Sequence, residues 1–422
     1  MKVSAIKGFS DVLPGDVETW QVVEEQARKM FAAYNFSEIR IPILEKTELF
    51  TRSIGETTDI VEKEMYTFAD RDAKGSLLTL RPEGTAGVVR AYVENELYKT
   101  EPVRKLFYVG PMFRRERPQK GRMRQFHQIG AEALGRSDPF IDAELLLLLN
   151  DFFAAVGVGG ASLQLNSLGC VRCRPPYREA LQKYLREREA QLCFNCRQRI
   201  ERNPLRVLDC KEPGCTEKTR NAPSILEHLC EACREHLEAV QRLLGAADVA
   251  FALNPRMVRG LDYYCRTAFE WISDQLGAQN AIAAGGRYDG LVHDLGGPSI
   301  PGVGFAIGVE RLVLLLKLKG PHGPRGPALY VVAIGRRARE WVFPLVRSLR
   351  RQGLTVEMDG EEKSLKSQMR RADKLKAETV LIVGDDELAR GRLIVRDMRK
   401  QRQEEIAAER AEAELLARKA GG

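Results

Sequence analysis

In the first 140 residues, the spacing of hydrophobic positions alternates between the period of a helix and the period of a strand. Apolar residues recur every three or four positions in "VETWQVVEEQARKMFAAY" (17–34), which predicts an amphipathic helix. Strands are predicted for "FSEIRIPILE" (36–45), "KLFYVGPMF" (105–113) and "RQFHQIGAE" (124–132), and strand, turn and helix for "SLLTLRPEGTAGVVRAYV" (76–93). Because hairpin-like loops rather than crossover helices separate these strands, we expect a largely antiparallel sheet.

The pattern changes near residues 170–240, which are charged, cysteine-rich and mostly helical, as in "YREALQKYLREREAQL" (177–192). Strand-forming, glycine-rich sequence resumes at 249 and continues through "GVGFAIGVERLVLLLKL" (302–318). We therefore predict an α+β domain over 1–320, built on a mostly antiparallel sheet, with a helical cysteine-rich subdomain inserted at about 170–240.

Glycine and proline gather in "KGPHGPRGPALY" (319–330), which predicts a linker at 321–328. Beyond it, over 329–400, strand and helix patterns alternate as in a small doubly wound α/β domain. The tail, 401–422, is charged and alanine-rich and is predicted to be helical.

Charge and composition narrow the class of protein. The chain has 422 residues and a net charge of +8, and residues 329–400 hold 17 basic against 11 acidic side chains. This excess suits a polyanionic partner, although a solvated basic face would have the same composition. No apolar run reaches membrane length and the N-terminus has no secretory core, so we expect a cytoplasmic protein with no membrane partner.

Several common chemistries find no support in the sequence. There is no G-x-x-x-x-G-K-[ST] phosphate loop, and "GVGFAIG" spaces its glycines wrongly for a dinucleotide fingerprint. Only five histidines occur, and no nucleophile-elbow serine accompanies them. A nucleotide bound here would therefore have to be held by arginine.

A strongly basic hairpin is the first candidate for such a site. Residues 114–124 carry six basic side chains against one acid, Glu116. In the strand that follows, one face holds Phe126, Gln128, Gly130 and Glu132. Gly130 would leave a slot for a small ligand, and Arg114 could neutralise a phosphate alongside it. The alternative is a polar strand face turned to solvent.

Three further segments supply compatible groups. In "TLRPEGTAG", Glu83 and Thr85 could bind an ammonium group, or Thr85 could cap a helix. In "MVRGLDYYCRTAFE", Arg259 precedes a glycine that permits close approach, although a surface ion pair would also explain it. In "GVGFAIGVERLVLLL", Gly304 and Gly308 would let a flat ring pack on a strand, with Arg311 over its other face.

Together these segments resemble the class II aminoacyl-tRNA synthetases. "IRIPILE", with Pro42, is similar to motif 1 of that class, "FRRERPQKGRMRQFHQIGAE" to motif 2, and "GFAIGVERL" to motif 3. "RGLDYYCRTAFE" and "AAGGRYDGL" resemble the two signatures of the histidyl-tRNA synthetase family. The resemblance covers nearly the whole chain, and its C-terminal domain looks like an anticodon-binding module.

The resemblance implies a role for each matching residue. Arg259 and Arg114 would be the catalytic residues, holding the α-phosphate. Histidine would be bound by Glu83, Gly84, Thr85, Gln128, Glu132, Arg259, Tyr263, Tyr264 and Tyr288. ATP would be bound by Arg114, Arg122, Arg311 and Gly304, and the acceptor end of the tRNA by Arg117 and Gln119.

The implied activity is the ATP-dependent ligation of L-histidine to tRNA(His) through a histidyl-adenylate, releasing AMP and diphosphate. Mg²⁺ would accompany ATP, and motif 1 implies a homodimer. One alternative is a histidine-binding regulatory paralogue that charges no tRNA; such paralogues lack the C-terminal domain, which this chain keeps together with Arg259. Another is a prolyl or threonyl enzyme, against which the "RGLDYY" segment argues.

The cysteines depart from the family pattern, in which this insertion does not usually carry metal. Eight of the nine form four close pairs: Cys170 and Cys173, Cys193 and Cys196, Cys210 and Cys215, Cys230 and Cys233. Such spacing is typical of zinc ribbons in a reducing compartment, and two four-cysteine sites would use all eight. Ordinary buried thiols or pairs that have lost their metal remain alternatives, and the sequence does not reveal which pairs combine. Cys265 stands apart and is predicted to be a small pocket-side residue.

Overall fold

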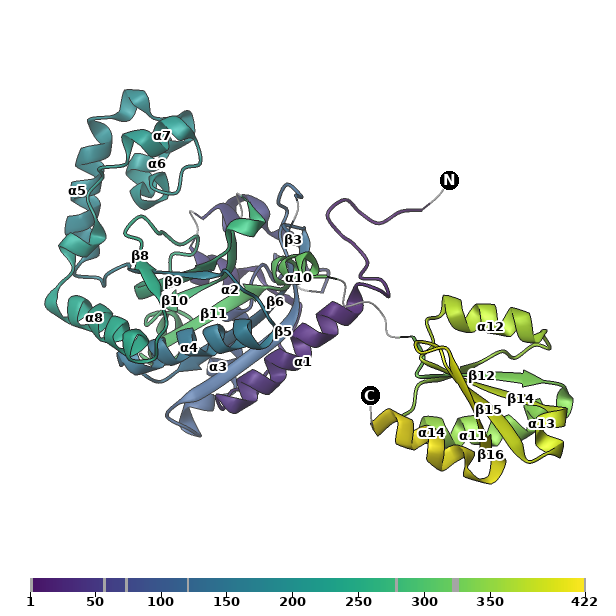
Figure 1. The fold of residues 1–422 in the computed structure, drawn as a ribbon. Coiled ribbons are helices and arrows are strands. Elements are labelled where there is room, and N and C mark those ends of the chain that lie inside the picture. Colours follow the sequence, from purple (N-terminus) through teal and green to yellow (C-terminus); the bar gives the residue numbers. More distant parts are fainter. Residues whose placement is uncertain are drawn as a thin grey trace. The chain divides into compact units, whose positions relative to one another are not determined.

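The computed structural model describes residues 3–55, 58–72, 75–119, 121–277, 280–320 and 326–420. The chain divides into two compact units, Met1–His322 and Gly323–Gly422 (Figure 1). Most of the predicted linker at 321–328 lies outside the described residues. Within the described ranges, no helix combines the length and the apolar character needed to cross a bilayer.

An eight-stranded sheet forms the centre of the first unit. Its strand order is β1-β5-β6-β11-β10-β9-β7-β8. The strands are β1 (Ser37–Glu38), β5 (Arg104–Phe113), β6 (Gln125–Leu134), β7 (Ser162–Ser167), β8 (Phe251–Leu253), β9 (Cys265–Ile272), β10 (Ala281–Arg287) and β11 (Gly302–Gly308). Only the two edge pairings, β1 with β5 and β7 with β8, are parallel. The predicted mostly antiparallel sheet is therefore confirmed.

The two faces of this sheet have different partners. Helices α1 (Val17–Ala33), α4 (Pro139–Ala155) and α10 (Val309–Leu318) pack on one face, where Ile129 and Ala131 of β6 are fully buried. The opposite face meets α3 (Thr85–Glu94), whose Tyr92 packs with Leu134 and Tyr288. Since side chains alternate along a strand, burying Ile129 in the first core turns Gln128 and Glu132 toward α3.

The segment predicted as one strand at 36–45 forms two short strands instead. The first is β1, and the second, β2 (Leu44–Lys46), belongs to a separate sheet of order β2-β4-β3 with β4 (Leu77–Leu80) and β3 (Tyr66–Ala69). Pro42 interrupts the strand because it has no N–H to donate. The guanidinium of Arg81 donates hydrogen bonds to the backbone carbonyls of Ile41 at 2.6 Å and Pro42 at 3.2 Å, which no strand among the described residues pairs.

The cysteine-rich insertion is helical, as predicted. It comprises α5 (Arg174–Arg186), α6 (Phe194–Arg202) and α7 (Pro213–Lys218), and α8 (Glu231–Ala246) leads back to the sheet (Figure 1). A buried polar network anchors α8: Nε2 of His236 lies 2.7 Å from a carboxylate oxygen of Asp142 on α4. The same carboxylate pairs with Arg287 of β10 at 2.8 Å, and both of these side chains are fully buried. Removing one member would leave the others unpaired, so this network fixes where the insertion rejoins the sheet.

The second unit is a five-stranded α/β domain of order β13-β12-β14-β15-β16. Its strands are β12 (Leu329–Ile334), β13 (Val356–Met358), β14 (Thr379–Gly384), β15 (Arg392–Asp397) and β16 (Arg402–Ala407). The first three are parallel, and α11 (Arg336–Arg351) and α12 (Leu365–Lys374) bury opposite faces of β12. The two-faced α/β arrangement is as predicted, with an antiparallel hairpin added at one edge.

The prediction of a wholly helical tail at 401–422 is wrong. Residues Arg402–Ala407 form β16, which pairs antiparallel with β15, and the helix α14 begins only at Ala411. The neighbouring strand supplies the hydrogen bonds that favour an extended chain here, and Ile406 reaches the core. Leu415 of α14 is buried in the same core. The domain therefore runs through the tail rather than ending at 400.

Candidate active site

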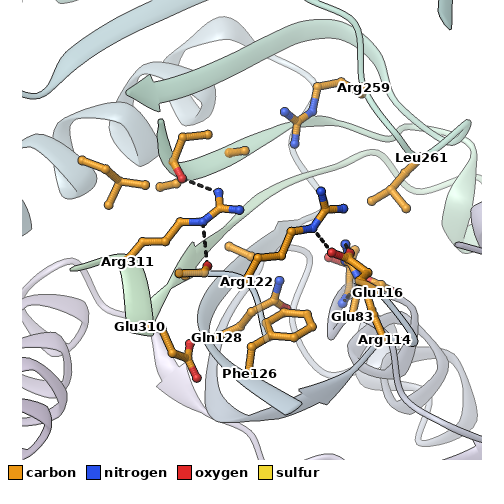
Figure 2. A pocket seen from close by; sticks show the side chains of 18 of the residues that line it. Glu83, Arg114, Glu116, Arg122, Phe126, Gln128, Arg259, Leu261, Glu310 and Arg311 are labelled. Carbon is orange, nitrogen blue, oxygen red and sulfur yellow. Dashed lines mark hydrogen bonds and ion pairs between the residues drawn. The ribbon is translucent and has the colours of Figure 1, made fainter. Parts of the chain in front are cut away.

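A cavity of about 250 Å³ opens on the α3 side of the large sheet. Figure 2 shows its charged lining: side chains from the β5–β6 hairpin, from the start of α10 and from the segment before β9 point into one space. The sequence-predicted residues among those that line it are Glu83, Thr85, Arg114, Arg122, Phe126, Gln128, Arg259, Tyr263, Tyr264, Gly308 and Arg311.

Four arginines from three separate segments meet in this cavity. Arg114 donates through Nε to the carbonyl of Pro82 at 2.8 Å, and Arg311 donates through Nη1 to the carbonyl of Ala281 at 2.6 Å. Arg122 pairs with Glu116, and Arg259 donates through Nη1 to Glu270 at 2.5 Å. Each guanidinium is held by a fixed protein group, so all four are oriented before any ligand enters.

The positive charge of the cavity arginines is not fully balanced by neighbouring acids. Burial, followed by the neighbouring guanidiniums of Arg122 and Arg114, lowers the pKa of Arg311. Burial likewise lowers the pKa of Arg114, against the opposing effect of Glu64 and Glu83. Guanidinium stays protonated in proteins, so the lowered pKa values indicate positive charge awaiting a partner. A polyanion such as a nucleotide phosphate is the complementary ligand.

The start of α3 forms one end of the cavity. The carboxylate of Glu83 accepts hydrogen bonds from the backbone N–H groups of Thr85 at 2.7 Å and Ala86 at 2.9 Å. Burial raises the pKa of this carboxyl group. The alternative in which Thr85 caps the helix is wrong, because its hydroxyl donates instead to Glu132 at 2.6 Å.

Glu132 lies behind the cavity wall rather than in it. Its carboxylate is fully buried and is hydrogen-bonded by the hydroxyls of Thr85 and Tyr288. Burial raises its pKa to about 8, so the unliganded site holds it protonated at neutral pH. Tyr288 is buried with it, and neither side chain lines the cavity.

Gly304 was predicted to bind ATP by leaving room for a flat ring, and the structure gives that space to another group. Gly304 pairs with Glu132 across β11 and β6. A Cβ at Gly304 would lie only 1.8 Å from a carboxylate oxygen of Glu132. The glycine is therefore needed to accommodate the buried carboxylate, and it does not line the cavity.

The slot predicted at Gly130 is already filled. Tyr108 of β5 stands opposite Gly130 in the sheet. Its ring packs where side chains at Gly130 and Gly84 would be, since a Cβ at either position would come within 2.2 Å of a ring carbon. Tyr108 is thus a cavity wall that sequence reasoning missed, and Gly84 supports that wall without lining the cavity.

Five buried polar atoms of the lining residues have no hydrogen-bond partner among the described residues. One of them, Oε2 of Glu116, lies in the ion pair with Arg122. The other four are Oε1 of Gln128, the hydroxyls of Tyr108 and Tyr263, and Nε of Arg259. Buried polar groups are normally satisfied, so unpaired groups gathered around one cavity indicate a polar ligand that completes them. They offer an acceptor, two hydroxyls and a cationic donor.

The tip of the basic hairpin lies outside this cavity. Arg117 and Gln119 are exposed and do not line it, and the backbone of Gln119 pairs with that of Arg122 across the loop. Cys265 does not line the cavity either; its sulfur accepts a hydrogen bond from the backbone N–H of Asp289. The structure therefore brings the histidine and phosphate candidates together and separates the tRNA candidates from them.

Sequence reasoning also missed the acids that hold the arginines. Glu116 was noted only as the single acid of the basic loop, yet it is buried against Arg122. Glu270, on β9, was not singled out, and its contact with Arg259 joins residues eleven positions apart in the chain. The isolation of Glu116 among six basic side chains is the sequence signal that could have found it, because a lone carboxylate among cations is expected to pair with one of them.

A second, larger groove of about 690 Å³ adjoins the cavity and shares Arg114, Arg122 and Arg259 with it. Its far wall belongs to the insertion and the segment before β9, and carries Arg199, Arg206, Lys211 and Arg256. Two groups of four cysteines in the same insertion could each hold a metal ion. The positively charged surface therefore continues from the cavity to the insertion.

Comparison with known proteins shows which family has this sequence and fold. A family model described as "Histidyl-tRNA synthetase" matches residues 8–312, and one described as "Anticodon binding domain" matches residues 328–418. Proteins named "Histidine--tRNA ligase" from Syntrophotalea carbinolica and Geobacter sulfurreducens are 55% and 57% identical, covering 100% and 94% of this chain and 100% and 95% of their own lengths.

A solved structure agrees. The apo histidyl-tRNA synthetase of S. aureus superposes with a TM-score of 0.82 at 34% identity, covering 98% of this chain and all of that one. The family model spans most of the chain, the relatives match it end to end, and the segments that resemble motif 2, motif 3 and the two histidyl signatures line one arginine-rich cavity. The chain belongs to the histidyl-tRNA synthetase family.

Proposed function

We propose that this protein ligates L-histidine to tRNA(His) at the expense of ATP, through a histidyl-adenylate. The observation that carries the proposal is the meeting of Arg114, Arg122, Arg259 and Arg311 in one cavity beside Glu83 and Gln128. Arginines provide the counter-charge for a triphosphate, while the carboxylate and amide offer acceptors for an amino acid's ammonium group. The site can thus hold the ATP triphosphate, an anion, beside the amino acid, a zwitterion, as amino-acid activation requires.

Histidine would bind at the α3 end of the cavity. Its ammonium group would meet Glu83 and the unpaired Oε1 of Gln128. Its imidazole would lie beside Tyr263 and Tyr264 and replace the Thr85 hydroxyl as the donor to Glu132, which frees Thr85 for the ammonium group. Tyr288 would hold Glu132 in place during this exchange.

ATP would occupy the arginine end, together with Mg²⁺. The adenine would lie between the ring of Phe126 and the guanidinium of Arg311, both of which line the cavity. Arg114 and Arg259 would hold the α-phosphate from two sides, and Arg122 would meet the phosphates beyond it. When bound with ATP, Mg²⁺ would offset the negative charge of the departing pyrophosphate.

The first step needs no protein base. The histidine carboxylate, already ionised at neutral pH, attacks the α-phosphorus in line, and the bond from that phosphorus to the bridging oxygen breaks to release pyrophosphate. Arg259 and Arg114 stabilise the charge that develops on the α-phosphate oxygens. Because both guanidiniums are oriented in advance by Glu270 and the Pro82 carbonyl, little reorganisation accompanies the step.

The second step transfers histidine to RNA. A ribose hydroxyl of the terminal adenosine attacks the activated carbonyl and passes its proton to the departing phosphate, and AMP leaves with the electron pair of the broken carbonyl–oxygen bond. Arg117 and Gln119, exposed at the hairpin tip, would guide the acceptor end. The second unit would bind the anticodon, and the reaction belongs in the cytoplasm, where tRNA and ATP are available.

We further propose a homodimer. The segment around Pro42 and the small sheet β2-β4-β3 carry four large apolar side chains that are between 40% and 49% exposed: Ile43, Leu44, Phe68 and Leu77. Apolar side chains gathered in this way are typical of a protein interface. Sedimentation at micromolar concentration would give twice the chain mass, and a monomer would contradict the assignment.

The regulatory-paralogue alternative is not favoured. The full-length relatives named "Histidine--tRNA ligase" match both units of this chain, and Arg259 lies in the cavity. ATP–pyrophosphate exchange with each standard amino acid in turn tests the proposal. We expect exchange with histidine alone, unchanged in the control Arg336→Ala, whose side chain lies in the second unit and is 87% exposed. Exchange driven by another amino acid, or none at all, would contradict the proposed function.

A further inference from the structure

Eight cysteines of the insertion meet as two groups of four. The first group is Cys170, Cys173, Cys230 and Cys233, and the second is Cys193, Cys196, Cys210 and Cys215. Within each group the four sulfur atoms all lie within 4.8 Å of one another. The outermost pairs of the sequence combine with each other, and the two inner pairs do the same, so one group is nested inside the other along the chain.

The sulfur–sulfur distances match a single tetrahedral ion. They are 3.7 Å between Cys170 and Cys173, 3.9 Å between Cys170 and Cys230, and 3.9 Å between Cys193 and Cys210. Four sulfurs at a zinc–sulfur distance of about 2.3 Å around one ion lie roughly 3.8 Å apart. A disulfide would bring two of them to about 2.05 Å. An iron–sulfur cluster would hold them farther apart, because its irons are themselves separated before each binds a thiolate.

Backbone hydrogen bonds support thiolates at both places. The N–H of Cys230 donates to the sulfur of Cys173 at 3.2 Å, and the N–H of Cys193 donates to the sulfur of Cys215 at 3.1 Å. Each of these bonds links the two halves of its group. Donors of this kind stabilise negative sulfur and orient it toward a metal. Each group also contains two buried cysteines and two half-buried ones, so its four thiolates would need a cation to offset their burial.

We propose that each group binds one zinc ion through four thiolates, as a structural site. Four protein ligands complete a tetrahedron and leave no open position for substrate, which distinguishes these sites from a catalytic zinc. Soft thiolate ligands in tetrahedral geometry favour zinc over magnesium or calcium. The inference is independent of the proposed ligase reaction, since neither group contacts the cavity lining in which that reaction is placed.

The first ion would close the insertion at its base. Cys170 and Cys173 follow β7, and Cys230 and Cys233 stand at the start of α8, so the ion joins the outgoing and returning chains across 60 residues. Cross-linking a loop of this length removes much of the entropy of its unfolded state. The short helices between them form a small unit, and such units commonly depend on a metal or disulfides for stability.

The second ion would fix the wall of the basic groove. Cys193 and Cys196 stand at the start of α6, and Cys215 lies in α7 with Cys210 shortly before it. Between the two pairs, Arg199 and Arg206 both reach Asp59, at 3.3 Å and 3.2 Å. These arginines line the 690 Å³ groove that adjoins the cavity. The second zinc would therefore hold the insertion's positive charge toward the catalytic sheet.

Metal analysis of the purified full-length chain tests the proposal. We expect two zinc ions per chain by mass spectrometry, one in Cys193→Ser/Cys196→Ser, one in Cys230→Ser/Cys233→Ser, and two in the matched control Cys265→Ser. A wild-type chain with no zinc, or double variants that both keep two, would overturn it. The zinc stoichiometry does not depend on activity. An inactive protein with two zinc ions would therefore contradict the ligase proposal and support the zinc proposal.

A second measurement covers variants that fail to fold. Wild-type chain produced with cobalt should show the intense visible bands of tetrahedral cobalt bound by sulfur, with two cobalt ions per chain. Weak bands typical of octahedral oxygen ligands would contradict the four-thiolate sites. Thiol titration of the native chain should then find Cys265 as the single cysteine outside the metal sites, whereas nine reactive thiols would also contradict them.

Discussion

The active-site cavity and the cysteine insertion are built by different forces. At the cavity wall, strand register brings Gln128, Glu132 and Gly304 onto one face of the sheet, while Glu116 holds Arg122 and Glu270 holds Arg259. In the insertion, short helices surround two groups of cysteines whose sulfurs are spaced for an ion. The cavity is thus organised before its ligand arrives, whereas the proposed zinc sites would make the shape of the insertion depend on bound ions.

Because of this difference, substitutions in the cavity should affect the reaction, and substitutions in the insertion should affect the fold. Losing Arg259 should remove the reaction and spare the fold, because its partner Glu270 is partly exposed and water can take the place of the guanidinium. Losing a thiolate should disturb the fold of the insertion first, because four ligands act as one unit. Activity and metal content therefore report on the two regions independently.

The largest expected effect is on the cavity. Arg259→Ala should lower histidine-dependent ATP–pyrophosphate exchange by about 10³-fold, because it removes a cation from the developing charge on the α-phosphate. The zinc content and the melting temperature should stay close to those of the unmodified protein. Near-normal exchange, or loss of zinc from this variant, would contradict the claim that activity and metal content depend on different regions. Arg336→Ala is the matched control.

Specificity for histidine should depend on the carboxyl group behind the cavity wall. Glu132→Gln should raise the KM for histidine by about 100-fold, because a charge-assisted hydrogen bond to the imidazole is lost. The KM for ATP should change little, since Glu132 does not line the arginine end. Equal changes in both constants would show that Glu132 supports the whole site rather than the amino acid.

The same carboxyl group predicts a pH dependence of stability. Glu132 titrates near 4.5 when unfolded and at about 8 in the folded protein, so between these values the folded state binds one more proton. Its contribution to the free energy of unfolding therefore falls as pH rises, by up to about 1.4 kcal/mol per pH unit. Urea unfolding at several pH values should show this slope for the unmodified protein and a shallower one for Glu132→Gln. Identical slopes would contradict the buried protonated state.

The smallest effect should come from the exposed hairpin tip. Arg117→Ala should raise the KM for tRNA about 3- to 10-fold, since one exposed phosphate contact contributes roughly 1 kcal/mol. Pyrophosphate exchange, which needs no tRNA, should be unchanged. A fall in exchange equal to the fall in charging would move Arg117 into the cavity and contradict its exposed position.

The sequence was sufficient for the sheet and for most of the cavity. Alternation along 125–134 correctly placed Gln128 and Glu132 on one face, because burial of Ile129 and Ala131 leaves no other register. The motif-bearing segments then indicated which arginines share the phosphate end. These are local patterns, and periodicity records them directly.

What the sequence could not supply depends on pairing between distant segments. The ring of Tyr108 fills the space at Gly130 because β5 and β6 align those two residues, and Gly304 accommodates Glu132 for the same reason. The tail at 402–407 is charged and looks helical, but β15 offers it a strand edge. The cysteine pairs combine only once the insertion's start and end are brought together.

The most direct test of the central claim is a rapid-quench experiment with enzyme, histidine and α-labelled ATP, and without tRNA. Convergence of the arginines on one phosphate beside a histidine pocket predicts a burst of histidyl-adenylate equal to the concentration of active sites, and no burst in Arg259→Ala. If ATP were cleaved only after tRNA was added, or if the Arg259→Ala variant gave the same burst, the account would be contradicted.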